Sequence, residues 1–150
     1  MSEAVSVDAG HSPSSQDTAE LLDRLSAFNR KQVPDLQRST DAIPCFVSAK
    51  TEDGTLVGAI SGRCLWNTLH IDLFWIEDDM RGQGLGQRLL SACERLAIGR
   101  GCVNAYLETF SWQAKPFYEN EGYRLLGTIE DMPIGHATHM LTKRLSPGSS

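Results

Sequence analysis

The segment from residue 81 to residue 86 has the residue pattern that most clearly predicts ligand binding in this chain. It reads Arg81-Gly82-Gln83-Gly84-Leu85-Gly86. Glycines let a backbone approach a ligand closely, because they carry no Cβ. A predicted helix follows, and its first N–H groups have no partner inside the helix and lie at the positive end of its dipole. Arg81 adds a permanent cation with forked donor geometry. The segment therefore predicts a binding site for phosphate groups.

Two common nucleotide-binding motifs do not fit this segment. A P-loop requires G-x-x-x-x-G-K-[ST], and the sequence contains no such run. A dinucleotide-binding turn requires G-x-G-x-x-G, but counting from Gly82 puts Gln87 at the third glycine position. The pattern that remains is R-x-x-G-x-G between a predicted strand and a predicted helix.

A second block of chemically suggestive residues lies between positions 107 and 123. It begins with L-E-T-F-S-W-Q-A and continues with F-Y-E-N-E-G-Y from Phe117 to Tyr123. This order predicts a strand, a polar turn at Ser111 that caps a short helix, and an aromatic–tyrosine pair on that helix, which stops at Gly122.

The two blocks together resemble the GNAT superfamily of acetyl-CoA-dependent N-acetyltransferases, over roughly residues 56–145. The resemblance implies an α/β fold with a mixed, twisted central sheet of six to seven strands flanked by helices. It also implies a cofactor site formed by three groups: the loop and helix start at Arg81, Gly82, Gln83, Gly84, Leu85, Gly86 and Gln87; the main chain of a splayed central strand at Phe74, Trp75 and Ile76; and Ser111. Many relatives carry Asn at the position of Ser111, and a serine can still cap the helix or bond to the cofactor.

Acetyl transfer to an amine has three requirements. The alkylammonium, with a reference pKa of about 10.4, must lose a proton before it can attack. The tetrahedral oxyanion needs hydrogen-bond donors aimed at it. The departing thiolate, with a reference pKa of about 8.5, is helped by a proton donor. In the family, the tyrosine that matches Tyr118 is this donor, and a phenol keeps its proton at pH 7.

The general base stays open between three residues. Strand alternation is expected to place His70, Asp72, Phe74 and Ile76 on one face. Glu108 lies on the neighbouring predicted strand. Asp72 and Glu108 are equally favoured, followed by His70, and water or the substrate itself remains an alternative proton acceptor.

The elements that must position these residues follow from the apolar pattern. Asp17 is expected to start a helix with Glu20 completing the cap, and Pro34 to stop it. Further helices are predicted near 84–99 and 112–121, and strands over 45–49, 56–66, 69–76, 103–109, 123–129 and 137–145. Residues 1–16 are predicted to be a flexible tail, and residues 17–146 a single domain.

Net charge, apolar runs and the spacing of cysteines and histidines argue against several classes of protein and site. A net charge of −5 argues against a nucleic-acid groove, which needs a basic stripe. The N-terminus does not resemble a signal peptide, and no apolar run approaches the ~20 residues that span a bilayer. Four cysteines without a C-x-x-C pair favour reduced thiols in a cytoplasmic protein. The spacing of His136 and His139 puts their rings on opposite faces of a strand, so no metal site is expected.

These observations predict an N-acetyltransferase that moves the acetyl group of acetyl-CoA to a primary amine, by direct attack in a ternary complex. The acceptor is expected to be a small molecule. Three alternatives remain open: a regulatory module that binds acyl-CoA without turnover, an enzyme acting on a protein amine, and an enzyme using a longer acyl-CoA. An exposed sheet edge near the C-terminus could pair two copies of the chain.

Overall fold

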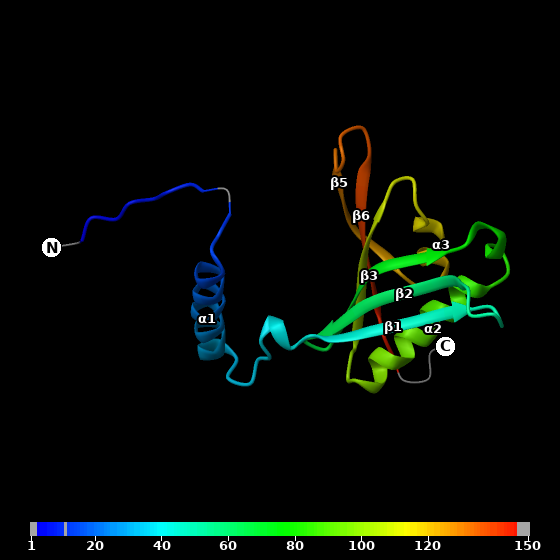
Figure 1. Cartoon of the computed structure of the whole chain (residues 1–150), viewed down its shortest axis with the longest axis horizontal. Helices are drawn as coiled ribbons and strands as arrows, with labels where there is room; N and C mark the ends of the chain where they lie inside the picture. The colour runs from blue at the N-terminus through cyan, green and yellow to red at the C-terminus, as the bar shows by residue number, and fades with distance from the viewer. Residues whose placement is uncertain (1–2, 11, 147–150) are drawn as a thin grey trace. The chain divides into compact units, whose positions relative to one another are not determined.

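A computed structural model describes residues 3–10 and 12–146, which divide into two units, one up to Arg38 and one from Ser39 (Figure 1). The first unit contains helix α1 (Ser15–Gln32). The helix begins two residues before the expected Asp17, so that expectation was wrong. The Ser14 hydroxyl accepts a hydrogen bond from the Asp17 N–H at 3.0 Å, and the Asp17 carboxylate accepts one from the Ser14 N–H at 3.3 Å. Asp17 is thus the third residue of the capping box rather than its cap.

Helix α1 is amphipathic, with Leu21, Leu25 and Phe28 spaced three or four residues apart. All three side chains are exposed. The single domain over residues 17–146 and the flexible tail over residues 1–16 stay predictions.

The second unit is built on a six-stranded mixed sheet in the order β1-β2-β3-β4-β6-β5. Only the β3–β4 pair is parallel, and the other four pairs are antiparallel. The strands are β1 (Ile43–Lys50), β2 (Leu56–Leu65), β3 (Thr68–Ile76), β4 (Asn104–Phe110), β5 (Arg124–Glu130) and β6 (Ala137–Arg144). The helices are α2 (Leu85–Gly99) and α3 (Lys115–Asn120), with short 3₁₀ turns η1 (Ser39–Asp41) and η2 (Asp78–Met80). The predicted mixed α/β fold with six strands is confirmed.

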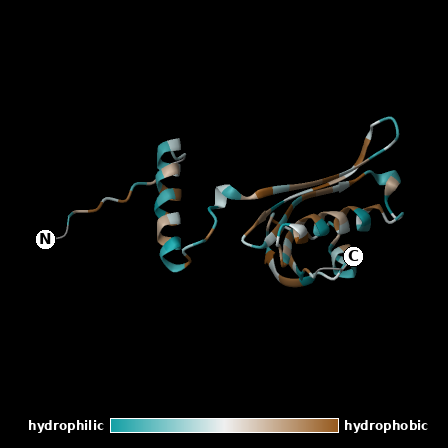
Figure 2. Ribbon diagram, turned by 90° about the horizontal axis from the view of Figure 1, so that it is seen from below, coloured by the Kyte–Doolittle hydropathy of each residue, from teal (hydrophilic) through white to brown (hydrophobic). Residues whose placement is uncertain are grey.

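Helix α2 crosses from β3 to β4 and lies along one side of the strands (Figure 2). Its buried residues recur at helical spacing, from Leu85 through Leu89 and Cys93 to Ala97. They pack against buried side chains of the sheet, chiefly Ile60, Leu69, Ile71, Leu107 and Leu141. Among the described residues, no helix is long and apolar enough to cross a bilayer.

Strands β3 and β4 pair over only part of their length. The last paired residues are Ile71 and Leu107, whereas β3 continues to Ile76 and β4 to Phe110 without further pairing to each other. The two strands therefore diverge beside the start of α2. This divergence leaves the β4-facing main chain of the end of β3 without a strand partner.

A β-bulge in β3 changes which side chains share a face. Gly62 of β2 pairs with Ile71 and Ser61 with Leu73, so Asp72 is an extra residue. The alternation shifts there, and Phe74 packs on the core side, with its ring 6.3 Å from that of Tyr118. The expectation that Phe74 and Ile76 share a face with His70 and Asp72 was wrong, because strict alternation requires unbroken pairing.

Gly62 permits this bulge by allowing close approach of the two backbones. A Cβ at Gly62 would lie 2.5 Å from the His70 carbonyl oxygen. That position faces backbone rather than a movable side chain, so only glycine fits without displacing β3.

A buried charged network joins α2 to the C-terminal strands. The Glu94 carboxylate on α2 is 5% exposed and accepts hydrogen bonds from the Tyr123 hydroxyl at 2.8 Å and from the Lys143 ammonium at 3.0 Å. The same ammonium lies 5.6 Å from the centre of the Tyr123 ring. Burial and the neighbouring carboxylate strongly raise the pKa of Tyr123, so its hydroxyl stays a donor.

Replacing Lys143 with methionine is expected to lower the free energy of unfolding by about 3 kcal/mol, because Glu94 would stay buried without its cation. Denaturant titration at pH 7, followed by circular dichroism, measures this change. The matched control is Lys115→Met, which removes an exposed pair with Glu119 and should cost no more than about 0.5 kcal/mol. Equal losses at the two lysines would contradict a structural role for the buried pair.

Candidate active site

The glycine-rich loop connects η2 to α2, and its glycines serve different purposes. Gly82 and Gly84 have φ angles of 76° and 81°, which favour glycine, and Gly84 caps α2. A Cβ at either position would meet no atom within 4 Å, so the space above the loop is open. A Cβ at Gly86 would instead lie 3.0 Å from Ile76 and 3.3 Å from Phe117. Gly86 therefore lets α2 pack closely against β3 and α3.

The loop presents backbone donors to that open space. Arg88 is the first residue of α2 whose N–H bonds back along the chain, to the Gly84 carbonyl at 3.2 Å. The preceding N–H groups at Leu85, Gly86 and Gln87 have no acceptor inside the helix. A helix start of this kind, opened by glycines, fits a diphosphate group.

Two side chains of the loop tie it to the preceding elements. Arg81 donates from Nε to the Ile76 carbonyl at 3.3 Å, and its guanidinium lies 3.3 Å from the Asp78 carboxylate. Gln83 donates to the Asp79 carbonyl at 3.0 Å. The loop is thereby fixed to the end of β3, next to the divergence from β4.

Tyr118 lies on α3, on the same side of the sheet as α2. Its side chain is 8% exposed and packs edge-on against Phe74, Phe117 and Tyr123. Burial raises the pKa of Tyr118 to about 12, so the phenol keeps its proton throughout the neutral range. Among the described residues, its hydroxyl has no hydrogen-bond partner, so the proton is available to a ligand.

The three candidate bases come together on the opposite face of the sheet. His70 Nδ1 lies 3.2 Å from the Asp72 carboxylate, and His70 Nε2 lies 3.6 Å from the Glu108 carboxylate. The Tyr106 ring stacks on the imidazole with centroids 4.3 Å apart. Asp72 shares a face with His70, as strand alternation predicts, and the cluster lies where β3 and β4 begin to diverge.

Arg63 completes this cluster, and it was missed by sequence reasoning. It lies on β2 directly opposite His70 in the strand register. Its guanidinium lies 2.8 Å from His70 Nδ1 and 3.3 Å from the Asp72 carboxylate. The only available signal was the register of the β2–β3 hairpin. The predicted strands, 56–66 and 69–76, put the turn at residues 67–68, whereas the structure has it at Trp66 and Asn67, so counting from the predicted turn misses this pair.

Ser111 does not cap a helix, so this expectation was wrong. Helix α3 begins at Lys115, with Ala114 at the cap position. The Ser111 hydroxyl instead accepts a hydrogen bond from the Ala137 N–H at 3.2 Å, and the Ser111 N–H donates to the Ala137 carbonyl at 2.8 Å. Ser111 thus ties the end of β4 to the start of β6, and its contact with a cofactor stays a prediction.

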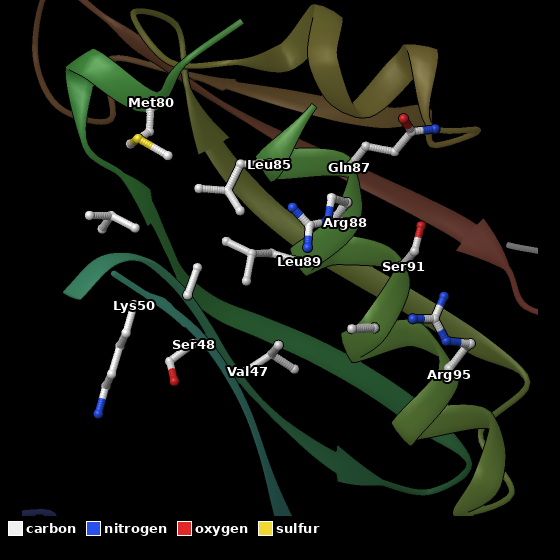
Figure 3. Close-up of a pocket in the computed structure, with 13 residues that line it drawn as sticks. Val47, Ser48, Lys50, Met80, Leu85, Gln87, Arg88, Leu89, Ser91 and Arg95 are labelled. Carbon is white, nitrogen blue, oxygen red and sulfur yellow. The ribbon is translucent and has the colours of Figure 1, made fainter. Parts of the chain in front are cut away.

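A cavity of about 760 Å³ lies between α2 and the β1–β2 hairpin (Figure 3). Leu85 and Leu89 project into it from α2, opposite Val47 of β1 (Figure 3). It shares Leu85 and Gln87 with the loop region, whereas neither Tyr118 nor the His70 cluster lines it. This cavity is therefore separate from the residues that could do chemistry.

The cysteines are buried in the core rather than placed at the candidate site. Cys45, Cys64, Cys93 and Cys102 are free thiols. Burial raises the pKa of Cys45 to about 11, and those of Cys93 and Cys102 to about 12. These three thiols stay protonated at neutral pH, so none of them is poised to act as a nucleophile.

The two histidines near the C-terminus have ordinary partners. His136 packs edge-on against Trp112, and His139 Nδ1 lies 2.8 Å from the Thr128 hydroxyl. Within residues 3–10 and 12–146, no group of three or more His, Cys, Asp or Glu side chains could hold a metal ion.

Comparisons with a protein family, with related sequences and with solved structures all identify acetyltransferases. Residues 15–123 match the acetyltransferase (GNAT) family. The blasticidin-S acetyltransferase of Streptomyces morookaense is 39% identical over 133 residues, covering 83% of this chain and 98% of that protein. The crystal structure of an acetyltransferase from Bacillus cereus superposes with a TM-score of 0.78 at 29% identity, covering 92% of this chain and 98% of the other. An aminoglycoside 6′-N-acetyltransferase complexed with coenzyme A shares the fold, with a TM-score of 0.64 at 18% identity and coverage of 93% and 98%. This chain belongs to the acetyltransferase (GNAT) family and is an acetyl-CoA-dependent N-acetyltransferase.

Proposed function

We propose that this enzyme acetylates a primary amine of a small, cationic molecule, and that blasticidin S is the first acceptor to test. The observation that carries the proposal is the 39% identity to blasticidin-S acetyltransferase over nearly the whole of that protein. The cluster of Asp72, Glu108 and Arg63 at the divergence of β3 and β4 has one more carboxylate than cations, which supports a cationic acceptor. The cytoplasmic location and the possible homodimer stay predictions.

The proposed position of acetyl-CoA follows from the open loop. The diphosphate lies against the N–H groups of Gly82–Gln87, with Arg81 beside it. The pantetheine arm runs along the free edge of β3, where Phe74, Trp75 and Ile76 have no strand partner on the β4 side among the described residues. The Ile76 carbonyl on this edge accepts a hydrogen bond from Arg81 Nε. The aminoglycoside enzyme of the same fold was crystallised with coenzyme A, so this fold accommodates the cofactor.

The proposed proton acceptor and the proposed proton donor lie on opposite faces of the sheet. Glu108 accepts a proton from the bound ammonium, and the neutral amine attacks the thioester carbonyl carbon. The new C–N bond forms and the C–S bond breaks, while Tyr118 gives its proton to the leaving sulfur. The attacking nitrogen loses a second proton to solvent, and Tyr118 regains one proton from solvent, so these two transfers cancel. The products are the N-acetyl compound, CoA as a thiol and one released proton.

The test of this function is an amine panel read by release of the CoA thiol. It contains blasticidin S, an aminoglycoside, a polyamine, a free amino acid and a peptide with a free N-terminus. Turnover of blasticidin S or another small cationic amine supports the proposal, whereas turnover of the peptide alone assigns the enzyme to protein amines. Binding of CoA without turnover of any amine would indicate a regulatory module. A parallel assay with longer acyl-CoAs tests the choice of acyl group.

Replacing Glu108 with glutamine is expected to lower kcat at pH 7 by about tenfold to a hundredfold, because an amide cannot accept the ammonium proton. The rate should recover near pH 10, where a free alkylamine itself begins to lose its proton. A pH–rate profile measures both effects. Glu130→Gln, at the far end of β5, serves as the control with an unchanged profile. A profile of Glu108→Gln that matches the wild type would assign the base to Asp72, His70 or water.

A further inference from the structure

Arg63 is the one cation of the carboxylate-bearing cluster among the described residues, and it contacts His70 directly. It projects from β2 and places one guanidinium nitrogen 2.8 Å from His70 Nδ1. Its other terminal nitrogen lies 3.3 Å from the Asp72 carboxylate. The guanidinium thereby bridges the imidazole and the bulged residue of β3.

This contact decides which nitrogen of His70 carries the proton. Arginine has five N–H donors and no acceptor, and it stays charged. A proton on Nδ1 would put two donors 2.8 Å apart with no acceptor between them. The Nδ1 atom must therefore present its lone pair to Arg63, and a neutral His70 carries its proton on Nε2.

Three further groups face the imidazole among the residues that the structure describes. Asp72 lies 3.2 Å from Nδ1, Glu108 lies 3.6 Å from Nε2, and the neutral ring of Tyr106 stacks on one side. Carboxylate oxygens accept hydrogen bonds, so without a third group the imidazole could carry its proton on either nitrogen. Arg63 removes this choice, because its N–H donor occupies the Nδ1 lone pair.

We propose that Arg63 is a positioning residue that locks His70 as the neutral Nε2–H tautomer and directs this N–H toward Glu108. The contribution to catalysis rests on the function proposed above. With Arg63 in place, Glu108 is the only carboxylate of the cluster without a cationic partner among the described residues. It is thus left free to take up the proton of the acceptor. Without Arg63, the Asp72 carboxylate accepts a hydrogen bond from Nδ1–H instead, and Glu108 loses the N–H that orients it.

The tautomer can be read directly by long-range ¹H–¹⁵N NMR of the imidazole, with His70 assigned through a His70→Asn variant. Wild-type enzyme at pH 7 should show an unprotonated Nδ1 and a protonated Nε2. Arg63→Met should show a protonated Nδ1, whereas the control Arg144→Met, on β6 of the same sheet, should match the wild type. A protonated Nδ1 in the wild type, or an unprotonated one in Arg63→Met, would overturn the proposal, and so would an equal change in Arg144→Met. The wild-type spectrum decides the matter even if Arg63→Met does not fold.

Kinetics separate positioning from mere structural support. Arg63→Met should lower kcat/KM for the acceptor at least fivefold at pH 7, because Glu108 loses the Nε2–H donor that orients its carboxylate. The Kd for acetyl-CoA should not change. An unchanged kcat/KM, or an equal loss of affinity for acetyl-CoA, would contradict the proposed role. If the wild type acetylates no amine, the proposed function fails, while the NMR result still decides the tautomer.

Discussion

Replacing Tyr118 with phenylalanine is expected to lower kcat at least tenfold and to leave the Kd for acetyl-CoA within about twofold. The change removes only a hydroxyl that has no partner among the described residues. The ring keeps its packing against Phe74, Phe117 and Tyr123. Steady-state kinetics and calorimetry with acetyl-CoA measure the two quantities. The loss falls on kcat because the hydroxyl acts only when the C–S bond breaks.

The raised pKa of Tyr118 determines when its proton is transferred and how the rate depends on pH. At a pKa of about 12 the buried phenol is a weaker acid than a thiol with a reference pKa of about 8.5. The proton therefore moves as the sulfur departs, not before. Because the phenol stays protonated up to about pH 11, the pH–rate profile should show no decline from Tyr118 between pH 6 and pH 10.

Tyr123→Phe is the matched control, since it removes a hydroxyl from the adjacent buried ring. That hydroxyl bonds to Glu94 at 2.8 Å, so its loss should cost about 1–2 kcal/mol of stability and change kcat little. Unchanged turnover in Tyr118→Phe at both neutral and high pH would remove Tyr118 from the mechanism.

Replacing Gly84 with valine is expected to weaken acetyl-CoA binding about a hundredfold. Gly84 has a φ angle of 81°, which a β-branched residue adopts only with strain. The new side chain would also project into the open space above the loop. Losing two charge-assisted hydrogen bonds from backbone N–H groups to the diphosphate should cost about 3 kcal/mol of binding free energy. This loss corresponds to roughly a hundredfold increase in Kd.

Gly54 provides a closely matched control for this substitution. It lies in the turn between β1 and β2, has a φ angle of 87°, and a Cβ there would also meet nothing within 4 Å. Gly54→Val should therefore carry a similar strain and lose similar stability while binding acetyl-CoA as the wild type does. Comparable affinities for the two variants, measured by calorimetry, would show that the loop does not hold the diphosphate.

The features that sequence predicted well are those set by local chemistry. The loop from Arg81 to Gly86 could be recognised because positive φ angles and close approach demand glycine. Helix α2 and the six strands follow from apolar periodicity, and the structure places their ends within a few residues of the predictions. Tyr118 came from a motif on a short helix, and the structure adds its burial.

The features that sequence did not predict depend on pairing between distant segments. The bulge at Asp72 reverses the faces of Phe74 and Ile76, and it exists because Gly62 on another strand lets the backbones meet. Arg63 reaches His70 only through the register of the hairpin. Ser111 bonds to Ala137 on a strand that the motif did not include. None of these contacts has a local signature.

The divergence of β3 and β4 opens the sheet between the two residues to which we assign the proton transfers. Glu108 and Tyr118 lie on opposite faces of the sheet, so in the proposed mechanism neither residue both removes and delivers a proton. Each face then exchanges its proton with solvent, and turnover requires no proton transfer between base and acid. In this mechanism the acceptor side can change to fit new amines while release of the thiol stays the same.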